Sequence, residues 1–274
     1  MPSSTHTLPQ RRPLATGTCC PVVEFRRYTL HPGTRDSLIT LFDREFIESQ
    51  EAVGMRVIAQ FRDLDAPDAF VWLRGFPDMP SRAESLRAFY DGPVWAEHRD
   101  AANATMIAWN DVRLLRPARP DSGFALGGAA RPGPESAAIP PGLVVATIYT
   151  LGAPASEGFT DAFERAIVPA LVKSGAPPIA AFETEPSVNT FPRLPVREGE
   201  HAFVWFARFA NLAAYERHVE ALEKAPSRRD ALRDSLRDSL RATLDRHLAA
   251  PADVWRLAPT ARSLVPGAGG AAVA

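Results

Sequence analysis

The chain has 274 residues, enough for one large domain or two medium ones, and its 46% hydrophobic and 23% charged content is ordinary for a globular protein. Lys and Arg (31) nearly balance Asp and Glu (32), and the net charge of −1 removes the electrostatic case for nucleic acid or an anionic membrane as main partner. No apolar run approaches the ~20 residues that span a bilayer, so we expect a cytoplasmic protein.

The N-terminal residues 1–20 predict a disordered leader, because they are polar and contain no apolar core of a signal peptide. Cys19 and Cys20 are adjacent, which is the spacing of neither a disulfide framework nor a metal site. We interpret them as incidental thiols in a reducing compartment. Arginine carries nearly all the positive charge, as we expect from a GC-rich bacterial genome.

The first half of the chain alternates between strand and helix periodicity. In chain order it predicts a strand over 22–30, a helix over 34–53, strands over 55–62 and 69–76, a helix from the capping box at Ser81 through Tyr90, a helix from Pro93, and a strand over 111–116. This β-α-β-β-α-β order is the ferredoxin-like arrangement. The first repeat is therefore assigned to residues 21–117.

Residues 118–142 are rich in Gly, Pro, Ala and Ser and predict a linker. A second set of elements follows over residues 143–259: strands over 144–151, 179–182, 201–209 and 253–259, helices over 156–173, 213–222 and 226–247, and a loop over 187–199. This loop is longer than its first-half counterpart. The Gly- and Ala-rich residues 260–274 predict a disordered tail.

Three pairs of matching segments occur in the same order in both halves. They are Tyr28-Thr29-Leu30 with Tyr149-Thr150-Leu151, Phe70-Val71-Trp72 with Phe203-Val204-Trp205, and the final strands that end at Pro117 and Pro259. The chain therefore contains an internal duplication. One ferredoxin-like unit leaves one sheet face uncovered, and two units bury these faces against each other. We predict an α+β fold of two tandem βαββαβ repeats packed sheet to sheet as a barrel, an intramolecular pseudo-dimer whose further oligomerisation stays open.

The alternation of the first strand gathers Glu24, Arg26 and Tyr28 on one face. A charged pair beside a tyrosine in a central strand is solvated, forms a salt bridge, or binds a ligand. The third strand carries Trp72 on an aromatic face, which suits core packing as well as a pocket wall. The sequence does not decide which face points into the barrel.

Several of these stretches resemble the NIPSNAP family over residues 22–117, and the second half does so more weakly. The matching stretches are EFRRYTLHPG at 24–33, FVWL at 70–73, and Pro93-Val94-Trp95 with His98-Arg99-Asp100-Ala101-Ala102-Asn103. The resemblance implies the dimeric α+β barrel superfamily. That superfamily includes cofactor-independent monooxygenases of aromatic or quinol-like substrates, haem-binding and haem-degrading proteins, isomerases and dehydratases, so it implies no single reaction.

The helix from Pro93 places Trp95, His98 and Arg99 within one turn of one another. A histidine here could act as a general base or as an axial haem ligand, and the alternative is a structural histidine. In the second repeat Pro93 corresponds to Pro226, and hydrophobic positions nearby are kept. The remaining equivalents are Arg228 for Trp95, Ala231 for His98 and Leu232 for Arg99. Any site is therefore asymmetric and on the first-half side, unless these positions have simply drifted.

We hypothesise a protein that binds a small apolar or aromatic molecule in the barrel, as an oxygenase or isomerase without a cofactor. His98 is the candidate proton-transfer group, and the other candidate residues are Glu24, Arg26, Tyr28, Trp72, Trp95 and Arg99. The alternatives are a non-catalytic binder of haem or another small molecule, and a structural or interaction module. No His, Asp or Glu spacing predicts a metal site, and no cofactor is predicted, with haem left open as the ligand of the non-catalytic alternative.

Overall fold

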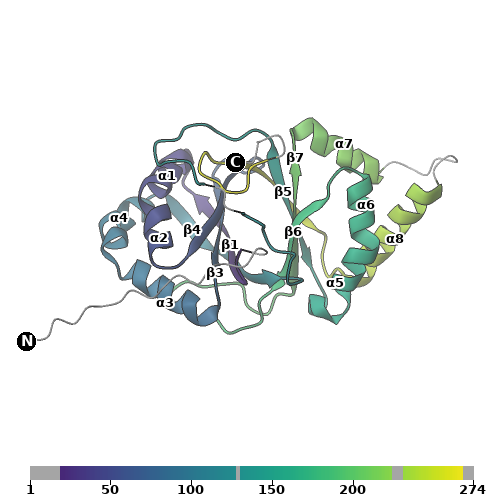
Figure 1. Ribbon diagram of the computed structural model, residues 1–274, viewed down its shortest axis with the longest axis horizontal. Helices are drawn as coiled ribbons and strands as arrows, with labels where there is room; N and C mark the ends of the chain where they lie inside the picture. Colours follow the sequence, from purple (N-terminus) through teal and green to yellow (C-terminus); the bar gives the residue numbers. More distant parts are fainter. Residues whose placement is uncertain (1–18, 128–129, 224–230, 268–274) are drawn as a thin grey trace, which may run out of the picture.

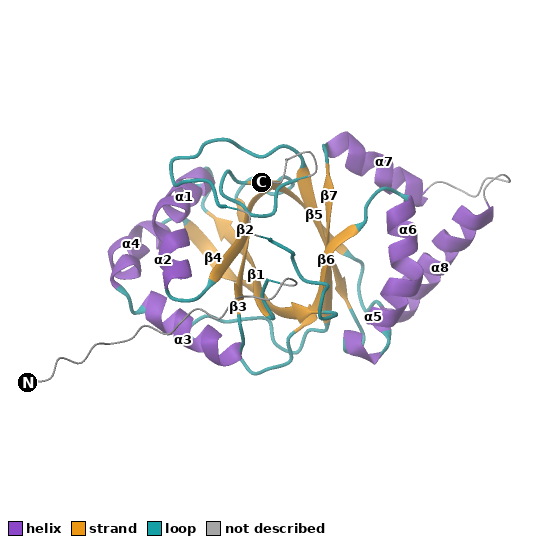
Figure 2. Cartoon of the chain, in the orientation of Figure 1, coloured by secondary structure: helices purple, strands orange, loops and turns teal. Residues whose placement is uncertain are grey.

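A computed structural model describes residues 19–127, 130–223 and 231–267, without the side chains of residues 231–237. An eight-stranded barrel lies at the centre, and a group of helices flanks it on either side (Figures 1 and 2). Most of the predicted leader, residues 268–274 of the predicted tail, and the start of the predicted helix at 226–230 lie outside the described residues.

The first repeat supplies the helices on one side of the barrel. Its elements are β1 (Val22–Leu30), α1 (Arg35–Leu41), η1 (Phe42–Phe46), α2 (Ile47–Ala52), β2 (Arg56–Asp63), β3 (Ala69–Phe76), α3 (Met79–Tyr90), α4 (Pro93–Asn103) and β4 (Met106–Pro117). Helix α3 begins before the predicted capping box, because the side chain of Asp78 accepts the backbone N–H of Ser81 and caps the helix there.

The second repeat supplies the helices on the other side. Its elements are β5 (Leu143–Thr150), η2 (Ala155–Glu157), α5 (Phe159–Ala162), η3 (Phe163–Ile167), α6 (Val168–Lys173), β6 (Pro178–Thr184), β7 (Ala202–Phe209), α7 (Leu212–Glu223), α8 (Ala231–His247) and β8 (Asp253–Pro259). The π-helical segments η1 and η3 occupy the same place in the two repeats, so this feature belongs to the fold.

The barrel closes in the order β1-β3-β2-β8-β5-β7-β6-β4. Each repeat contributes four neighbouring strands, and the two sheets join along the short antiparallel pairs β2–β8 and β4–β6. The predicted α+β fold of two tandem repeats packed as a barrel is therefore confirmed.

The barrel interior is a packed core. Phe25 lies 4.9 Å from Trp255 and 5.4 Å from Phe206, measured between ring centroids. Phe124, which comes from the linker, packs 5.0 Å from Phe206 and is 3% exposed. The residues of β1 that alternate with Glu24 and Arg26 thus point inward, and side chains fill the space in which we expected a ligand.

The prediction of a disordered tail is wrong for residues 260–267, because they pack against the barrel. The N–H of Thr260 donates to the carbonyl of Gln60 at 3.0 Å, and Val265 is fully buried in the barrel core. Arg262 is 1% exposed and donates to the carbonyl of Pro132 at 2.8 Å. The small-residue composition of the tail concealed these few anchoring side chains.

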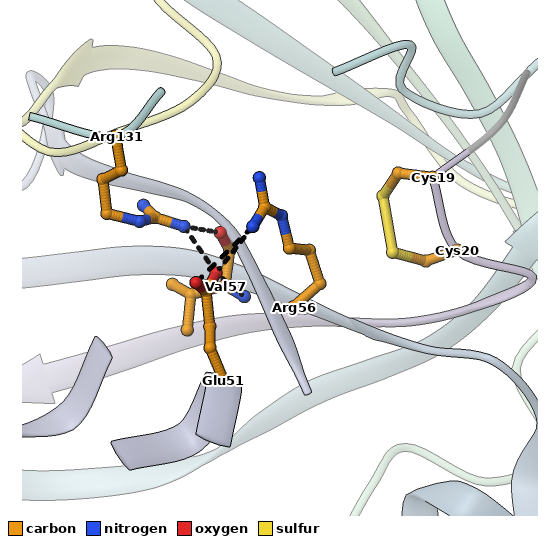
Figure 3. The surroundings of a disulfide bond; sticks show 6 residues. All are labelled: Cys19, Cys20, Glu51, Arg56, Val57 and Arg131. Carbon is orange, nitrogen blue, oxygen red and sulfur yellow. Dashed lines mark hydrogen bonds and ion pairs between the residues drawn. A yellow bond between two sulfur atoms is a disulfide. The ribbon is translucent and has the colours of Figure 1, made fainter. Parts of the chain in front are cut away.

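Cys19 and Cys20 are joined by a disulfide just before β1, so their interpretation as free thiols is wrong (Figure 3). Cys20 belongs to the barrel core, and its sulfur occupies the space beside Gly75, where a Cβ would lie 2.3 Å from it. Figure 3 also shows Arg131 of the linker, which donates to the carboxylate of Glu51 at 2.8 Å. The linker and the tail therefore both anchor on the first repeat.

The packed tail predicts a specific loss of stability. Val265→Ala removes buried methyl groups and should lower the free energy of unfolding by about 2 kcal/mol, measured by urea denaturation. Val188→Ala is the control, since Val188 is 83% exposed and should change the value by less than about 0.5 kcal/mol. Equal effects of the two substitutions would contradict the packing of the tail.

Candidate functional site

The polar face of β1 lies between the sheet and the helices of the first repeat. Glu24 and Arg26 are 0% exposed, and Tyr28 and Trp72 beside them are buried as well. The apolar side chains that cover them come from the helices of the same repeat: Leu38, Ile39, Phe42, Phe46, Leu86 and Phe89. The structure thus brings together four of the predicted binding residues, on the face of the sheet that is turned away from the barrel interior.

Glu24 accepts hydrogen bonds from three arginines. Its carboxylate oxygens lie 2.6 Å from Nη1 of Arg26, 2.7 Å from Nε of Arg74 and 2.7 Å from Nε of Arg82. Arg74 lies opposite Glu24 in the pairing of β1 with β3, and Arg82 comes from α3. All four side chains are fully buried. We call these four residues the arginine cluster.

The arginine cluster is ionised and carries excess positive charge. Burial alone would raise the pKa of Glu24, but Arg74, Arg26 and Arg82 outweigh it and hold that pKa far below its usual value. Burial likewise would lower the pKa of Arg26, yet Tyr28 and Glu24 raise it. Three guanidinium groups therefore face one carboxylate, which leaves two positive charges without a partner carboxylate in the cluster.

Four buried nitrogens in and beside the cluster have no hydrogen-bond acceptor among the described residues. Nη2 of Arg74 and Nη2 of Arg82 still lie 2.7 Å from an oxygen of Glu24, so the two donors without any partner are Nη2 of Arg26 and Nε1 of Trp72. Arg26 lies opposite Trp72 in the strand pairing, and its guanidinium carbon is 5.5 Å from the ring centroids of both Trp72 and Tyr28. Buried donors usually have partners, so these two are unusual. Nε1 of Trp205, the counterpart of Trp72 in the second repeat, is also without a hydrogen-bond partner, so of the two donors the one particular to the first repeat is Nη2 of Arg26.

The second repeat builds the same layer without these charges. Its strand pairing places Val145 opposite Ala207 where the first repeat has Glu24 opposite Arg74. Thr147 takes the position of Arg26, while the tyrosine and the tryptophan of this face are kept as Tyr149 and Trp205. The fold therefore forms this layer from uncharged side chains, and the arginine cluster is an addition to it.

A loop of the second repeat covers the cluster. Asn189 and Thr190 accept hydrogen bonds from Nη1 of Arg82 at 3.0 and 3.2 Å. Phe191 stacks on Tyr90 with 6.0 Å between ring centroids, and it is buried among the side chains of the first repeat. The predicted long loop over 187–199 thus packs on the first repeat and covers the arginine cluster.

Sequence reasoning missed Arg74, Arg82 and the residues of the covering loop as candidate site residues. Arg74 alternates with Trp72 along β3, so the strand periodicity that found Trp72 also places Arg74 on its face. Arg82 and Asn189 come from distant elements, and no sequence spacing relates them to Glu24.

Of the candidate residues on α4, only Trp95 lies near the arginine cluster. Its ring packs 4.9 Å from the ring of Tyr90, and the ring of Tyr90 lies 5.8 Å from the guanidinium carbon of Arg74. Nε2 of His98 instead lies 3.5 Å from a carboxylate oxygen of Glu45 in η1, a partner that the sequence did not reveal.

Arg99 is 57% exposed and pairs with Asp100. The structure therefore brings neither His98 nor Arg99 to the cluster. The second-repeat residues to which Pro93 and Trp95 were compared, Pro226 and Arg228, lie outside the described residues.

Two features are absent from the described part of the chain. No three His, Cys, Asp or Glu side chains gather there in a way that could hold a metal ion. No described helix combines the length and the apolar character needed to cross a membrane.

The fold and this layer define a duplicated α+β barrel protein. The NIPSNAP family model matches residues 23–120, which are the first repeat, and the resemblance found in the sequence is confirmed there. No curated protein matches the sequence.

Three solved structures illustrate the likeness. A proposed monooxygenase from Lactobacillus acidophilus shares 14% identity with a TM-score of 0.51, covering 88% of this chain and 94% of its own. A proposed monooxygenase from Fusobacterium nucleatum shares 9% identity with a TM-score of 0.52, covering 92% and 96%. A NIPSNAP-like domain protein from Burkholderia xenovorans shares 27% identity, covering 34% of this chain and 81% of its own, with a TM-score of 0.32. The first two likenesses show the fold.

The comparison of the repeats predicts how the cluster affects stability. Glu24→Gln leaves three buried arginines without their carboxylate and should lower the free energy of unfolding by about 3–5 kcal/mol. A fourfold variant removes the whole cluster. Glu24→Val, Arg26→Thr and Arg74→Ala introduce the residues of the second repeat, and Arg82→Met introduces an apolar side chain. The fourfold variant should be more stable than Glu24→Gln alone in urea denaturation. If it were the less stable of the two, the fold would need the charges themselves.

Proposed function

We propose that the first repeat binds a small molecule with an anionic oxygen on an aromatic or apolar body. The site is the layer between β1–β3 and the covering helices. The observation that carries this proposal is the buried excess of arginine, together with the two donors without any partner, Nη2 of Arg26 and Nε1 of Trp72.

A buried charge without a partner is costly, and a bound anion lowers that cost by pairing with it. Guanidinium groups match carboxylate, phenolate and enolate oxygens in geometry and in charge. The rings of Tyr28, Trp72 and Tyr90 surround the arginines at 5.1–5.8 Å from their guanidinium carbons and provide an aromatic wall for the rest of the ligand.

The arginine cluster is suited to holding an anion and not to moving a proton. Glu24 is already bound to three arginines and its pKa is depressed, so it is a weak base. Burial raises the pKa of Tyr28 against the lowering effect of Arg26, so the phenol stays protonated near neutral pH.

An oxygenase or isomerase without a cofactor is the second candidate function. Arginines that hold a ligand's anionic oxygen would also stabilise an enolate or phenolate as it forms, which is the electrostatic part of such catalysis. Two neighbours of the same fold are proposed monooxygenases, and this reaction class is taken from them as a hypothesis.

Matched ligand pairs test the proposal. Sodium benzoate and other aromatic carboxylates should bind the wild-type protein at least tenfold more tightly than their neutral amides, followed by tryptophan fluorescence or calorimetry. Arg26→Thr should abolish this preference while the protein stays folded. A wild-type protein that binds the acids and the amides equally, or binds neither, would rule the anion site out.

The role of His98 is tested in the same assay. Because the cluster's charges do not change near neutral pH, benzoate affinity should be flat between pH 5.5 and 8 and unchanged in His98→Ala. Haem titration should give no Soret band that depends on His98. A band lost in His98→Ala, or benzoate binding lost in that variant, would instead support the histidine-based alternatives.

A further inference from the structure

A cavity of about 220 Å³ lies in the sheet–helix layer of the second repeat. It opens between β6, which lies beside α5 and α6 in Figure 1, and the linker residues 118–122 that follow β4. Its lining is mainly apolar and includes Phe163, Val168, Ile179, Ala181 and Phe203. It is therefore separate from the arginine cluster, which belongs to the first repeat.

The first repeat fills the equivalent space. Gln60 lies opposite Trp72 in the pairing of β2 with β3, and Ala181 lies opposite Trp205 in the pairing of β6 with β7. Gln60 is fully buried, whereas its counterpart Ala181 has a shorter side chain and lines the cavity.

The chain segments that leave the two repeats show the same difference. The N–H of Thr260 donates to the carbonyl of Gln60 at 3.0 Å, and the N–H of Ala118 donates to that of Ala181 at 3.1 Å. These two segments are therefore equivalent. Thr260 is fully buried with its hydroxyl 3.3 Å from the side-chain oxygen of Gln60, and Ala118 has nothing to replace that hydroxyl.

The arginines of these segments also differ. Arg262 is buried across the helices of the first repeat, where it bonds the carbonyl of Asp43 and the carboxylate of Glu48. In the second repeat Arg119 is 38% exposed and turns outward to Asp161 and Glu164. No arginine therefore covers the second-repeat space in the manner of Arg262 among the described residues, and its mouth stays open.

We propose that this cavity is a second binding site, which takes a small neutral aromatic or apolar molecule. An apolar cavity of about 150 Å³ is enough to bind benzene, so the present one accommodates a single substituted ring. The uncharged polar side chains of the lining already have partners: Ser122 donates to the carbonyl of Ala181 at 2.7 Å, and Thr160 to that of Ala155 at 3.3 Å. Of the charged ones, Arg119 and Glu164 form an ion pair, and Asp121 is exposed. The site therefore favours neutral ligands, in contrast to the arginine cluster.

The test refills the cavity with the side chains of the first repeat. Fluorobenzene is titrated into the full-length protein and followed by ¹⁹F NMR. Saturable binding is expected to the wild-type protein, at least tenfold weaker binding to the double variant Ala181→Gln, Ala118→Thr, and unchanged binding to Val172→Gln, a control at an exposed position of α6.

Equal binding to the wild-type protein and the refilled variant, or no saturable binding to the wild-type protein, would overturn the proposal. Near-UV circular dichroism shows whether the double variant folds. If it does not, Ala181→Val is read in the same way. Benzoate binding at the arginine cluster should be unaffected by these substitutions, and Arg26→Thr should leave fluorobenzene binding unchanged, so the two sites are tested separately.

Discussion

The contact between Glu24 and three arginines determines how the first repeat is organised. One carboxylate joins β1, β3 and α3, and through Arg82 it also connects to the loop of the second repeat. A buried network of this kind tolerates loss of the whole more easily than loss of one member. Three arginines face this one carboxylate, so the cluster holds more positive than negative charge. This imbalance is the basis of the proposed anion binding.

The duplication provides an internal comparison that single-domain proteins lack. Both repeats keep a tyrosine and a tryptophan on the helix-facing side of the sheet, and both keep a π-helical segment above it. One repeat adds arginines to this layer, whereas the other leaves an apolar cavity. The barrel between them is filled by aromatic side chains and serves as a shared core. The barrel interior is thus packed in both repeats, and the two proposed binding sites lie under the helices.

Local periodicity predicted the repeats, the barrel and the shared face of Glu24, Arg26 and Tyr28, because strand alternation is a property of neighbouring residues. It could not show which face points inward, since both faces of β1 carry large side chains that become buried. Helical spacing drew attention to His98, yet the partner of its ring is Glu45 in a distant π-helical segment. Arg82, Asn189 and the anchoring residues of the tail reach their partners only through tertiary contacts.

The most direct test is a crystal structure of the wild-type protein soaked with 4-bromobenzoate. The bromine's anomalous signal locates the ligand independently of the protein's own density. The account predicts a ligand beneath the helices of the first repeat, with its carboxylate within about 3 Å of Nη2 of Arg26 and its ring against Trp72. A ligand found inside the barrel, or an arginine cluster whose two open donors bind only water in the soaked crystal, would contradict it.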